Sequence, residues 1–346
     1  MADIENENTS QFHAAAWDDG SFDTSLRPAR LDEFIGQKRI HENLKIFIQA
    51  SLDRKEPLDH LLFSGLPGLG KTTLAHIVST ELGARFHSTS GPALEKAYDI
   101  VGPLTKMEWC DVLFIDEIHR LSRPIEEYLY TAMEDFQIDL VIDKGPGARS
   151  VKIDLKPFTL IGATTREGLL SAPLRSRFGV MERLEPYATE DLVTIVERSA
   201  TLLHVKIERE AALLLAERSR GTPRVVNRFL RRIRDIAQVR EKPVIDAGIA
   251  REGLRMLGVD DLGLEPMDRQ ILNVLARTGI PAGLKTIAAA VGEEERTIED
   301  VYEPHLLRCG FIAKTPRGRT LTEGGRRALG LETDEEAGRD PGDLFS

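Results

Sequence analysis

Short apolar runs alternate with longer amphipathic stretches over the first half of the chain. Residues 61–64, 112–115 and 158–161 are apolar runs of strand length, whereas residues 40–52 and 72–82 place apolar side chains at helical spacing. Apolar strands separated by helices are typical of parallel βαβ units that are covered on both faces. We therefore expect an α/β domain with a doubly wound parallel sheet, in which ligands bind at the carboxyl ends of the strands.

Residues 137–156 interrupt this pattern with two strand-like runs. Apolar and polar residues alternate on both sides of a central Gly145-Pro-Gly147. Alternation on either side of a glycine- and proline-rich turn predicts a β-hairpin. We expect this hairpin to be an insertion in the α/β domain.

The pattern becomes wholly helical after Tyr187. Residues 208–220 and 223–239 are two amphipathic segments, and Pro223 suits the first turn of the second one. We predict a small helical domain over residues 187–258.

The last part of the chain changes character again. Three short helical patterns are followed by two short strands, and these segments are residues 267–276, 284–291, 296–308, 311–315 and 319–322. Three short helices followed by a β-ribbon are typical of a winged helix, a relative of the helix-turn-helix. We predict a winged-helix domain over residues 259–331.

The net charge of −10 is concentrated in the two ends of the chain. Residues 1–25 contain six acidic residues and no lysine or arginine, and residues 332–346 contain six acidic residues and one arginine. Both ends are poor in large apolar residues, so we predict two acidic disordered tails. The remaining residues 26–331 are close to neutral, so an acidic chain can still carry basic patches.

The composition limits the class of protein. With 346 residues, 41% of them hydrophobic, the chain can form two or three folded domains, of which we place the α/β domain at residues 26–186. No apolar run approaches the roughly 18 residues of a membrane span, and the acidic start does not resemble a signal peptide. Cys110 and Cys309 are too few for a disulfide scaffold. We expect a cytoplasmic chain with no membrane partner.

The first apolar run ends in a glycine-rich loop, Gly65-Leu-Pro-Gly68-Leu-Gly70-Lys71-Thr72. The loop fits G-x-x-x-x-G-K-[ST] at every position, and it lies between a predicted strand and a predicted helix. In such a loop backbone N–H groups wrap the phosphates, the lysine reaches the β- and γ-oxygens, and the hydroxyl binds Mg²⁺. The sequence therefore predicts a site for ATP and Mg²⁺, and the absence of an N-K-x-D element argues against GTP.

An acidic pair, Asp116-Glu117, ends the second apolar run. In the same sheet as a phosphate-binding loop, Asp116 would hold Mg²⁺ and Glu117 would orient and deprotonate the attacking water. A pair of solvated carboxylates is the alternative, and the neighbouring loop disfavours it.

Two weaker signals follow the third apolar run. Thr165 could place a hydroxyl near the γ-phosphate, or it could cap a turn. Arg175 and Arg177 form either a basic surface turn or an arginine finger that neutralises charge on the transferred phosphoryl group. A finger that acts from a neighbouring subunit would require an oligomer.

Two basic segments lie in the second half of the chain. Residues 218–234 contain seven arginines and no acidic residue, and we interpret most of them as a solvated helix face, with Arg224 at the helix start as a phosphate sensor. Lys314, Arg317 and Arg319 lie on the predicted wing. Such a cluster can bind DNA phosphates with little sequence information, although winged helices also serve protein contacts.

Together these motifs resemble the AAA+ ATPases, and most closely the RuvB family of bacterial Holliday-junction branch-migration motors. The resemblance covers about residues 22–331, and its stretches are Leu26-Arg-Pro, Phe34-Ile-Gly-Gln37, Gly65 to Thr73, Leu113 to Arg120, Gly162 to Arg166, Leu174 to Gly179, Arg220 to Arg224 and Thr315-Pro-Arg-Gly-Arg319. The middle motifs also occur in clamp loaders, whereas their combination with the winged helix is more specific.

The resemblance implies roles for individual residues. Thr165 would be the first sensor, Arg224 the second sensor and Arg177 the finger acting in trans. Nucleotide contacts are implied for Leu26, Arg27, Ile35, Gly65, Gly68, Gly70, Lys71, Thr72, Thr73, Glu134, Asp135, Phe136, Arg177, Tyr187 and Arg224. DNA contacts are implied for Arg296, Lys314, Arg317 and Arg319.

The resemblance also implies partners: the duplex arms of a Holliday junction, RuvA bound to the 137–156 hairpin, the resolvase RuvC, and a homohexameric ring. Two positions depart from the family pattern, because Glu295 stands where a basic residue is frequent and Lys314 stands where arginine is usual. A clamp-loader-like ATPase and an ATP-switched transcriptional regulator remain the alternative functions. A collar domain in place of the winged helix would favour the first, and a dispensable Glu117 would favour the second.

Overall fold

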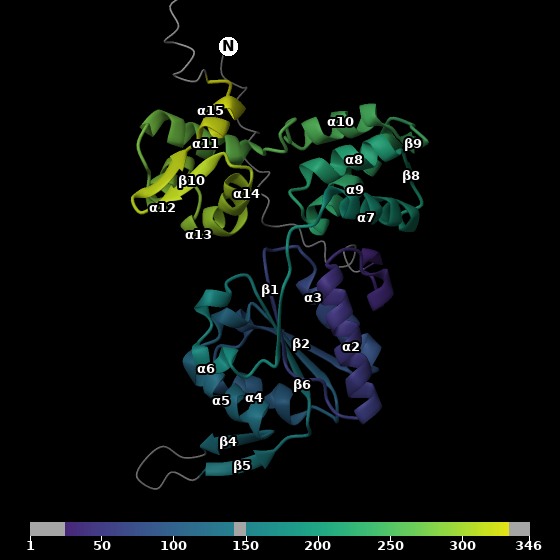
Figure 1. The fold of residues 1–346 in the computed structure, drawn as a ribbon, viewed down its shortest axis with the longest axis vertical. Coiled ribbons are helices and arrows are strands. Elements are labelled where there is room, and N and C mark those ends of the chain that lie inside the picture. The colour runs from purple at the N-terminus through teal and green to yellow at the C-terminus, as the bar shows by residue number, and fades with distance from the viewer. Residues whose placement is uncertain (1–24, 142–149, 332–346) are drawn as a thin grey trace, which may run out of the picture.

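The computed structural model describes residues 25–141 and 150–331. The chain forms an α/β domain, followed by a helical domain and a winged-helix domain (Figure 1). The helical and winged-helix domains lie side by side at one end of the α/β domain, and the β4–β5 hairpin lies at its other end. The two acidic tails, for which we predicted disorder, lie outside the described residues except for Ser25.

A five-stranded parallel sheet forms the centre of the α/β domain. Its order is β2-β3-β6-β1-β7. The strands are β1 (Leu61–Ser64), β2 (Phe86–Ser90), β3 (Val112–Asp116), β6 (Thr159–Thr164) and β7 (Val180–Arg183). The predicted parallel sheet is confirmed, and the three apolar runs are its central strands.

Successive residues of the central strands enter two different cores. Leu61 and Phe63 pack with α2 (Lys38–Arg54) and α3 (Lys71–Leu82), whereas Leu62 packs on the opposite face. The second face is covered by α4 (Ala97–Thr105), α5 (Arg123–Glu134) and the short α6 (Ala172–Arg175). Burial on both faces explains why the central strands are continuous apolar runs.

The predicted hairpin is present as β4 (Gln137–Val141) and β5 (Ser150–Asp154), which pair antiparallel in a sheet of their own. The Gly145-Pro-Gly147 turn lies outside the described residues. Ile138, at the base of the hairpin, is fully buried in the core of the α/β domain. The core therefore anchors the hairpin at its base.

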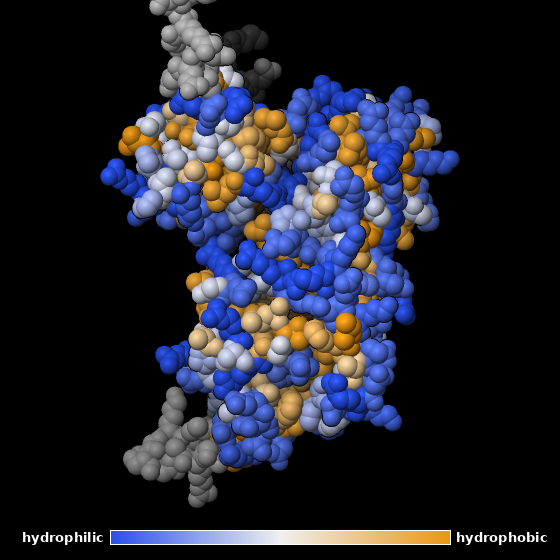
Figure 2. Space-filling view, viewed as in Figure 1, coloured by the Kyte–Doolittle hydropathy of each residue, from blue (hydrophilic) through white to orange (hydrophobic). Residues whose placement is uncertain are grey.

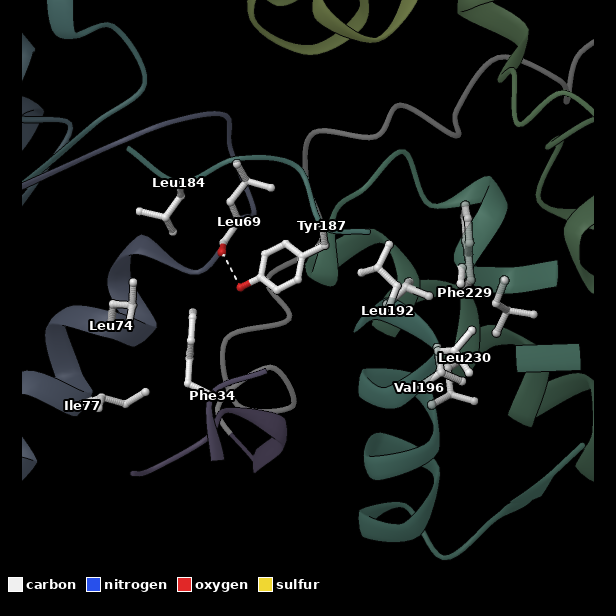
Figure 3. Packing of buried hydrophobic residues seen from close by; sticks show 14 of the residues in the cluster. Phe34, Leu69, Leu74, Ile77, Leu184, Tyr187, Leu192, Val196, Phe229 and Leu230 are labelled. Carbon is white, nitrogen blue, oxygen red and sulfur yellow. Dashed lines mark hydrogen bonds between the residues drawn. The ribbon is translucent and has the colours of Figure 1, made fainter. Parts of the chain in front are cut away.

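The helical domain contains four helices and a small parallel strand pair. The helices are α7 (Thr189–Leu202), α8 (Arg209–Arg218), α9 (Pro223–Val239) and α10 (Ala247–Met256), and the strands are β8 (Lys206–Ile207) and β9 (Val244–Ile245). Its core is continuous with one face of the α/β domain. Figure 3 shows Tyr187 between Phe34 and Leu74 of the α/β domain and Leu192 and Phe229 of the helical domain.

The winged-helix domain has a separate core. Its elements are α11 (Pro266–Thr278), α12 (Leu284–Val291), α13 (Glu295–Thr297), η5 (Ile298–Tyr302), α14 (Glu303–Arg308), β10 (Ile312–Thr315), β11 (Gly318–Leu321) and α15 (Glu323–Ala328). The predicted helix at 296–308 is helical throughout, with a π-helical turn in its middle. A Cβ at Gly318 would lie 2.3 Å from the carbonyl oxygen of Ala282, so the wing turn requires glycine.

Charged contacts join the winged-helix domain to both other domains. Arg220 of the helical domain pairs with the fully buried Asp268 at 2.5 Å, and Arg166 of the α/β domain pairs with Asp300 at 2.7 Å. Burial raises the pKa of Asp268 to about 6, against the opposing effect of Arg220. The side chains of Arg218 and Arg220 are only 13% and 9% exposed. The solvated face that we predicted for most arginines of residues 218–234 is therefore wrong for these two.

The surface of the α/β domain is partly apolar on the face in view (Figure 2). Within residues 25–141 and 150–331, no helix has the length and apolar character that crossing a bilayer demands.

Candidate nucleotide-binding and catalytic site

A pocket lies between the α/β domain and the helical domain, next to the carboxyl ends of β1, β3 and β6. The predicted site residues that line it are Leu26, Arg27, Ile35, Gly68, Gly70, Lys71, Thr72, Thr73, Asp116, Glu117, Thr165, Tyr187 and Arg224. Residues far apart in sequence thus meet in one place, as expected at the edge of a parallel sheet.

The loop between β1 and α3 has the backbone conformation that its glycines allow. Gly65, Gly68 and Gly70 have φ values of +137°, +78° and +102°. A Cβ at Gly68 would lie 2.8 Å from Thr222 Cγ2, so only glycine fits between the loop and the helical domain. Gly65 itself does not line the pocket, but its carbonyl oxygen helps to hold Lys71.

Lys71 begins α3, and its ammonium is held inside the loop. Its Nζ donates hydrogen bonds to the carbonyl oxygens of Gly65 and Leu66 at 2.8 and 2.9 Å. Burial lowers the pKa of Lys71 to about 8, and the carboxylates of Asp116 and Glu117 oppose that shift. An anionic phosphate in the pocket would favour the charged form, because opposite charges stabilise each other at short range.

Asp116 ends β3, and Glu117 follows it in the left-handed region, with a φ of +50°. Asp116 Oδ1 accepts a hydrogen bond from the Glu117 backbone N–H at 2.9 Å. Burial and the neighbouring Asp116 raise the pKa of Glu117. A carboxyl group with a raised pKa is a better proton acceptor, as general-base catalysis requires.

Two residues connect the pocket to the helical domain. Tyr187 donates a hydrogen bond from its hydroxyl to the carbonyl oxygen of Leu69 at 3.2 Å (Figure 3). Arg224 lies in the first turn of α9 and also lines the pocket. A ligand bound to the loop would therefore contact residues of both domains.

Sequence reasoning missed several residues of this pocket. Phe34 and Asn227 line it, and Arg198 donates a hydrogen bond to the carbonyl oxygen of Leu26 at 2.8 Å. Asn227 could have been found, because it lies one turn after Arg224 on the same helix. Arg198 gave no signal, since it lies on an ordinary amphipathic helix.

Four predicted nucleotide contacts lie together outside this pocket, and they are Glu134, Asp135, Phe136 and Arg177. Arg177 donates to Glu134 at 2.6 Å, and its guanidinium lies 4.7 Å from the centre of the Tyr130 ring. Phe136 packs edge-on against Phe158. Within one described chain these residues do not line the pocket between the α/β and helical domains.

The structure separates the predicted DNA-binding residues into two groups. Arg317 is exposed in the wing turn, whereas Lys314 and Arg319 both pair with Glu303, at 3.0 and 2.6 Å. Arg296 pairs with Asp300 at 3.4 Å on the side of the domain that contacts Arg166. Its positive charge also lowers the pKa of Glu117, against the larger effect of burial.

A phosphate-binding loop, an acidic pair on a neighbouring strand and a helical domain over the pocket define an ATPase of the AAA+ class. Three family models match the chain. They are the Holliday junction DNA helicase RuvB P-loop domain over residues 26–184, the RuvB AAA lid domain over 187–260 and the RuvB C-terminal winged helix domain over 261–330. The chain therefore belongs to the RuvB family, and the predicted fold class is confirmed.

Relatives match nearly the whole folded chain. The Holliday junction branch migration complex subunit RuvB of Kosmotoga olearia is 56% identical over 309 residues, which cover 89% of this chain and 90% of the relative. The solved structure of the Thermotoga maritima RuvB Holliday junction branch migration motor is 48% identical, with a TM-score of 0.82. The match covers 89% of this chain and 99% of the Thermotoga chain. A point mutant of the same Thermotoga protein gives a TM-score of 0.83.

Proposed function

We infer that this chain is an ATP-driven motor that promotes branch migration of Holliday junctions. The observation that carries this function is one chain in which an ATPase pocket is joined by charged contacts to a winged-helix domain. Changes at the pocket can therefore move a DNA-binding element. A winged helix follows the helical domain, whereas a clamp loader would carry a collar domain, so the clamp-loader alternative is not favoured.

Different residues of the pocket carry out different steps of ATP hydrolysis. Backbone N–H groups of the loop and Lys71 bind the phosphates, and Glu117 orients a water molecule and accepts its proton. Thr165 and Arg224 sense the γ-phosphate from the two domains. The Thr72 hydroxyl and the Asp116 carboxylate suit Mg²⁺, a hard cation that prefers oxygen ligands and neutralises phosphate charge when bound.

A ring of identical subunits would give a role to the four predicted nucleotide contacts that lie outside the pocket. Arg177, with Glu134, Asp135 and Phe136, would reach the nucleotide of a neighbouring subunit, and this assembly is a homohexamer. Large exposed apolar side chains support subunit contacts on the α/β domain, among them Tyr98 at 61%, Trp109 at 57% and Leu169 at 60%.

The remaining partners follow from the family. The Kosmotoga relative is a subunit of a branch migration complex. We propose that the 137–156 hairpin docks on RuvA and that the motor works with the resolvase RuvC in the cytoplasm. The domain boundaries that we propose are 26–186, 187–258 and 259–331.

Strand exchange on a synthetic four-way junction tests the function. We expect conversion of the junction into two duplexes when this chain, RuvA, ATP and Mg²⁺ are all present, and no conversion when ATP or Mg²⁺ is left out. ATP turnover stimulated by linear DNA alone, without any junction conversion, would contradict the branch-migration function and favour a different DNA-dependent ATPase.

Neutralising the wing should weaken DNA binding in a salt-dependent way. Each lost phosphate contact lowers the slope of log K against log salt by about 0.9, so Arg317→Ala should lower it by about 0.9. Adding Lys314→Ala and Arg319→Ala should lower it by up to about 2.7 in total, and by less if the Glu303 pairs persist on DNA. Salt titrations on two unrelated duplexes measure both slopes.

Lys242→Ala is the matched control, because Lys242 is exposed two residues before β9, and β9 lies on the side of the helical domain away from the winged helix (Figure 1). It should leave the slope unchanged. An unchanged slope in the triple wing variant would show that these wing residues do not contact DNA phosphates. A loss confined to one of the duplexes would indicate base readout and would favour the regulator function.

A further inference from the structure

His119 lies directly behind the acidic pair, and neither the fold nor the proposed mechanism gives it a role. It belongs to the short helix η3 (Ile118–Arg120) that follows β3, and its side chain is only 2% exposed. Its Nδ1 lies 2.9 Å from Thr164 Oγ1, and its Nε2 lies 3.3 Å from Glu117 Oε2. The ring therefore lies between the end of β6 and the Glu117 carboxylate.

The Glu117 carboxylate beside Nε2 selects the tautomer of this ring, because an ionised carboxylate only accepts hydrogen bonds. Thr164 Oγ1 accepts a hydrogen bond from the backbone N–H of Arg166 at 3.0 Å, and its own hydroxyl proton is available for His119 Nδ1. With Nδ1 as the acceptor, a neutral imidazole carries its proton on Nε2. Burial and the nearby Arg296 and Arg166 lower the pKa of His119, which favours the neutral ring.

The Nε2–H group then faces one hydrogen-bond acceptor, the Glu117 carboxylate. Within the described part of the chain, this buried nitrogen has no hydrogen bond of normal geometry, and the Glu117 carboxylate is its charged neighbour at 3.3 Å. An unsatisfied buried donor is costly, so the pair gains when the carboxylate turns toward the ring. Catalytic hydrogen bonds are often long in a ligand-free site and shorten when the substrate binds.

We infer that His119 is a positioning residue that holds the Glu117 carboxylate in its catalytic orientation. The Glu117 side chain is 31% exposed, and among residues 25–141 and 150–331 only His119 places a polar side-chain atom in ion-pair distance of that carboxylate, at 3.3 Å. Without it, the carboxylate loses a restraint on its rotamers while its charge and its access to the pocket stay the same. This inference rests on the proposed role of Glu117 in ATP hydrolysis.

The same chain of contacts extends to the winged-helix domain. Arg166, whose N–H donates to Thr164, also holds Asp300 Oδ1 at 2.7 Å and Glu299 Oε2 at 2.8 Å through its guanidinium. Asp300 and Glu299 lie in the π-helical turn η5. A movement of the winged-helix domain can therefore reach Glu117 through Arg166, Thr164 and His119.

Glutamine and asparagine variants separate positioning from packing. The amide nitrogen of a glutamine can occupy the place of the imidazole Nε2, whereas an asparagine reaches only the place of Nδ1. We expect His119→Asn and His119→Ala to lower kcat for ATP by about 10–100-fold, the scale expected when a catalytic group is displaced by about 1 Å. His119→Gln should retain most of the activity. The Kd for a nonhydrolysable ATP analogue should stay the same in all three variants.

The outcomes distinguish this inference from the proposed function. Equal kcat values in the glutamine and asparagine variants, or a loss that appears in nucleotide affinity, would overturn the role of His119. Wild-type protein without DNA-stimulated ATP hydrolysis would instead overturn the proposed function. Thermal unfolding of each variant identifies any loss that comes from misfolding. If the asparagine and alanine variants misfold, a folded glutamine variant with a kcat about 10–100-fold below that of the wild type would overturn the role of His119.

A double-mutant cycle tests the connection to the winged-helix domain. Asp300→Asn weakens the Arg166 contact, and it should change the DNA stimulation of kcat in the wild-type background but much less in the His119→Ala background. Additive effects of the two changes would show that the winged-helix contact does not act through His119.

Discussion

Glu117→Gln should bind ATP with nearly wild-type affinity and should lose hydrolysis. The glutamine keeps the size of the side chain and can still touch a water molecule, but it cannot accept a proton. General-base catalysis contributes about 10²–10⁴-fold to rates, so kcat should fall by at least about 100-fold. Fluorescent ATP binding and single-turnover hydrolysis, measured on the same preparation, give the two quantities.

Lys71→Ala is the complementary control. It removes the ammonium that Gly65 and Leu66 hold inside the loop, so it should abolish ATP binding and, with it, hydrolysis. Wild-type turnover in the Glu117→Gln variant would show that another group activates water. It would also restore the interpretation of this chain as an ATP-dependent switch, which needs no efficient catalytic base.

The interior of the sheet could be predicted from the sequence, whereas its edges could not. β1, β3 and β6 are buried on both faces and therefore appear as apolar runs. The edge strands β2, with the sequence Phe-His-Ser-Thr-Ser, and β7, with Val-Met-Glu-Arg, are partly exposed, and their residues follow no simple pattern. A strand covered on one side only carries a weaker signal, because solvent tolerates polar residues there.

In the site, residues within short sequence motifs could be predicted, whereas contacts between residues distant in sequence could not. Lys71, Thr72, Asp116 and Glu117 lie in short motifs whose spacing reflects one turn or one strand end, so the sequence alone predicts them, and all four line the pocket. His119 also lies next to that motif, but its role depends on Thr164, which belongs to a strand 45 residues further along the chain. Sequence spacing does not reveal a contact of this kind.

The number of basic residues in a segment predicted the basic patches, but it did not predict which of these residues form ion pairs with acidic side chains. Lys314 and Arg319 were expected to bind phosphate, and both contact Glu303 from the neighbouring helix α14. A count of basic residues is therefore an upper bound on the phosphate contacts that a wing can make. The exposed Arg317 is the wing residue for which the simple electrostatic argument holds best.

Arg177→Ala should retain nucleotide binding and lose hydrolysis, because its guanidinium lies outside the pocket of its own chain. Arginine fingers supplied in trans contribute about 10³–10⁵ to the rate in other nucleotide hydrolases, so basal turnover should fall to near background. Arg175→Ala is the matched neighbour, since Arg175 is exposed two residues earlier, and it should retain activity. Steady-state ATPase assays with both variants measure the difference.

Mixing the Arg177→Ala and Lys71→Ala chains tests whether the finger acts between subunits. In a mixed ring, some interfaces join an intact loop on the Arg177→Ala chain to an intact arginine on the Lys71→Ala chain. We expect ATPase activity to rise above that of either variant alone and to reach a maximum at intermediate mixing ratios. Failure to recover activity at any ratio, with mixed rings confirmed by native mass spectrometry, would mean that Arg177 acts within its own chain or has no catalytic role. Loss of activity in Arg175→Ala instead would assign the finger to Arg175.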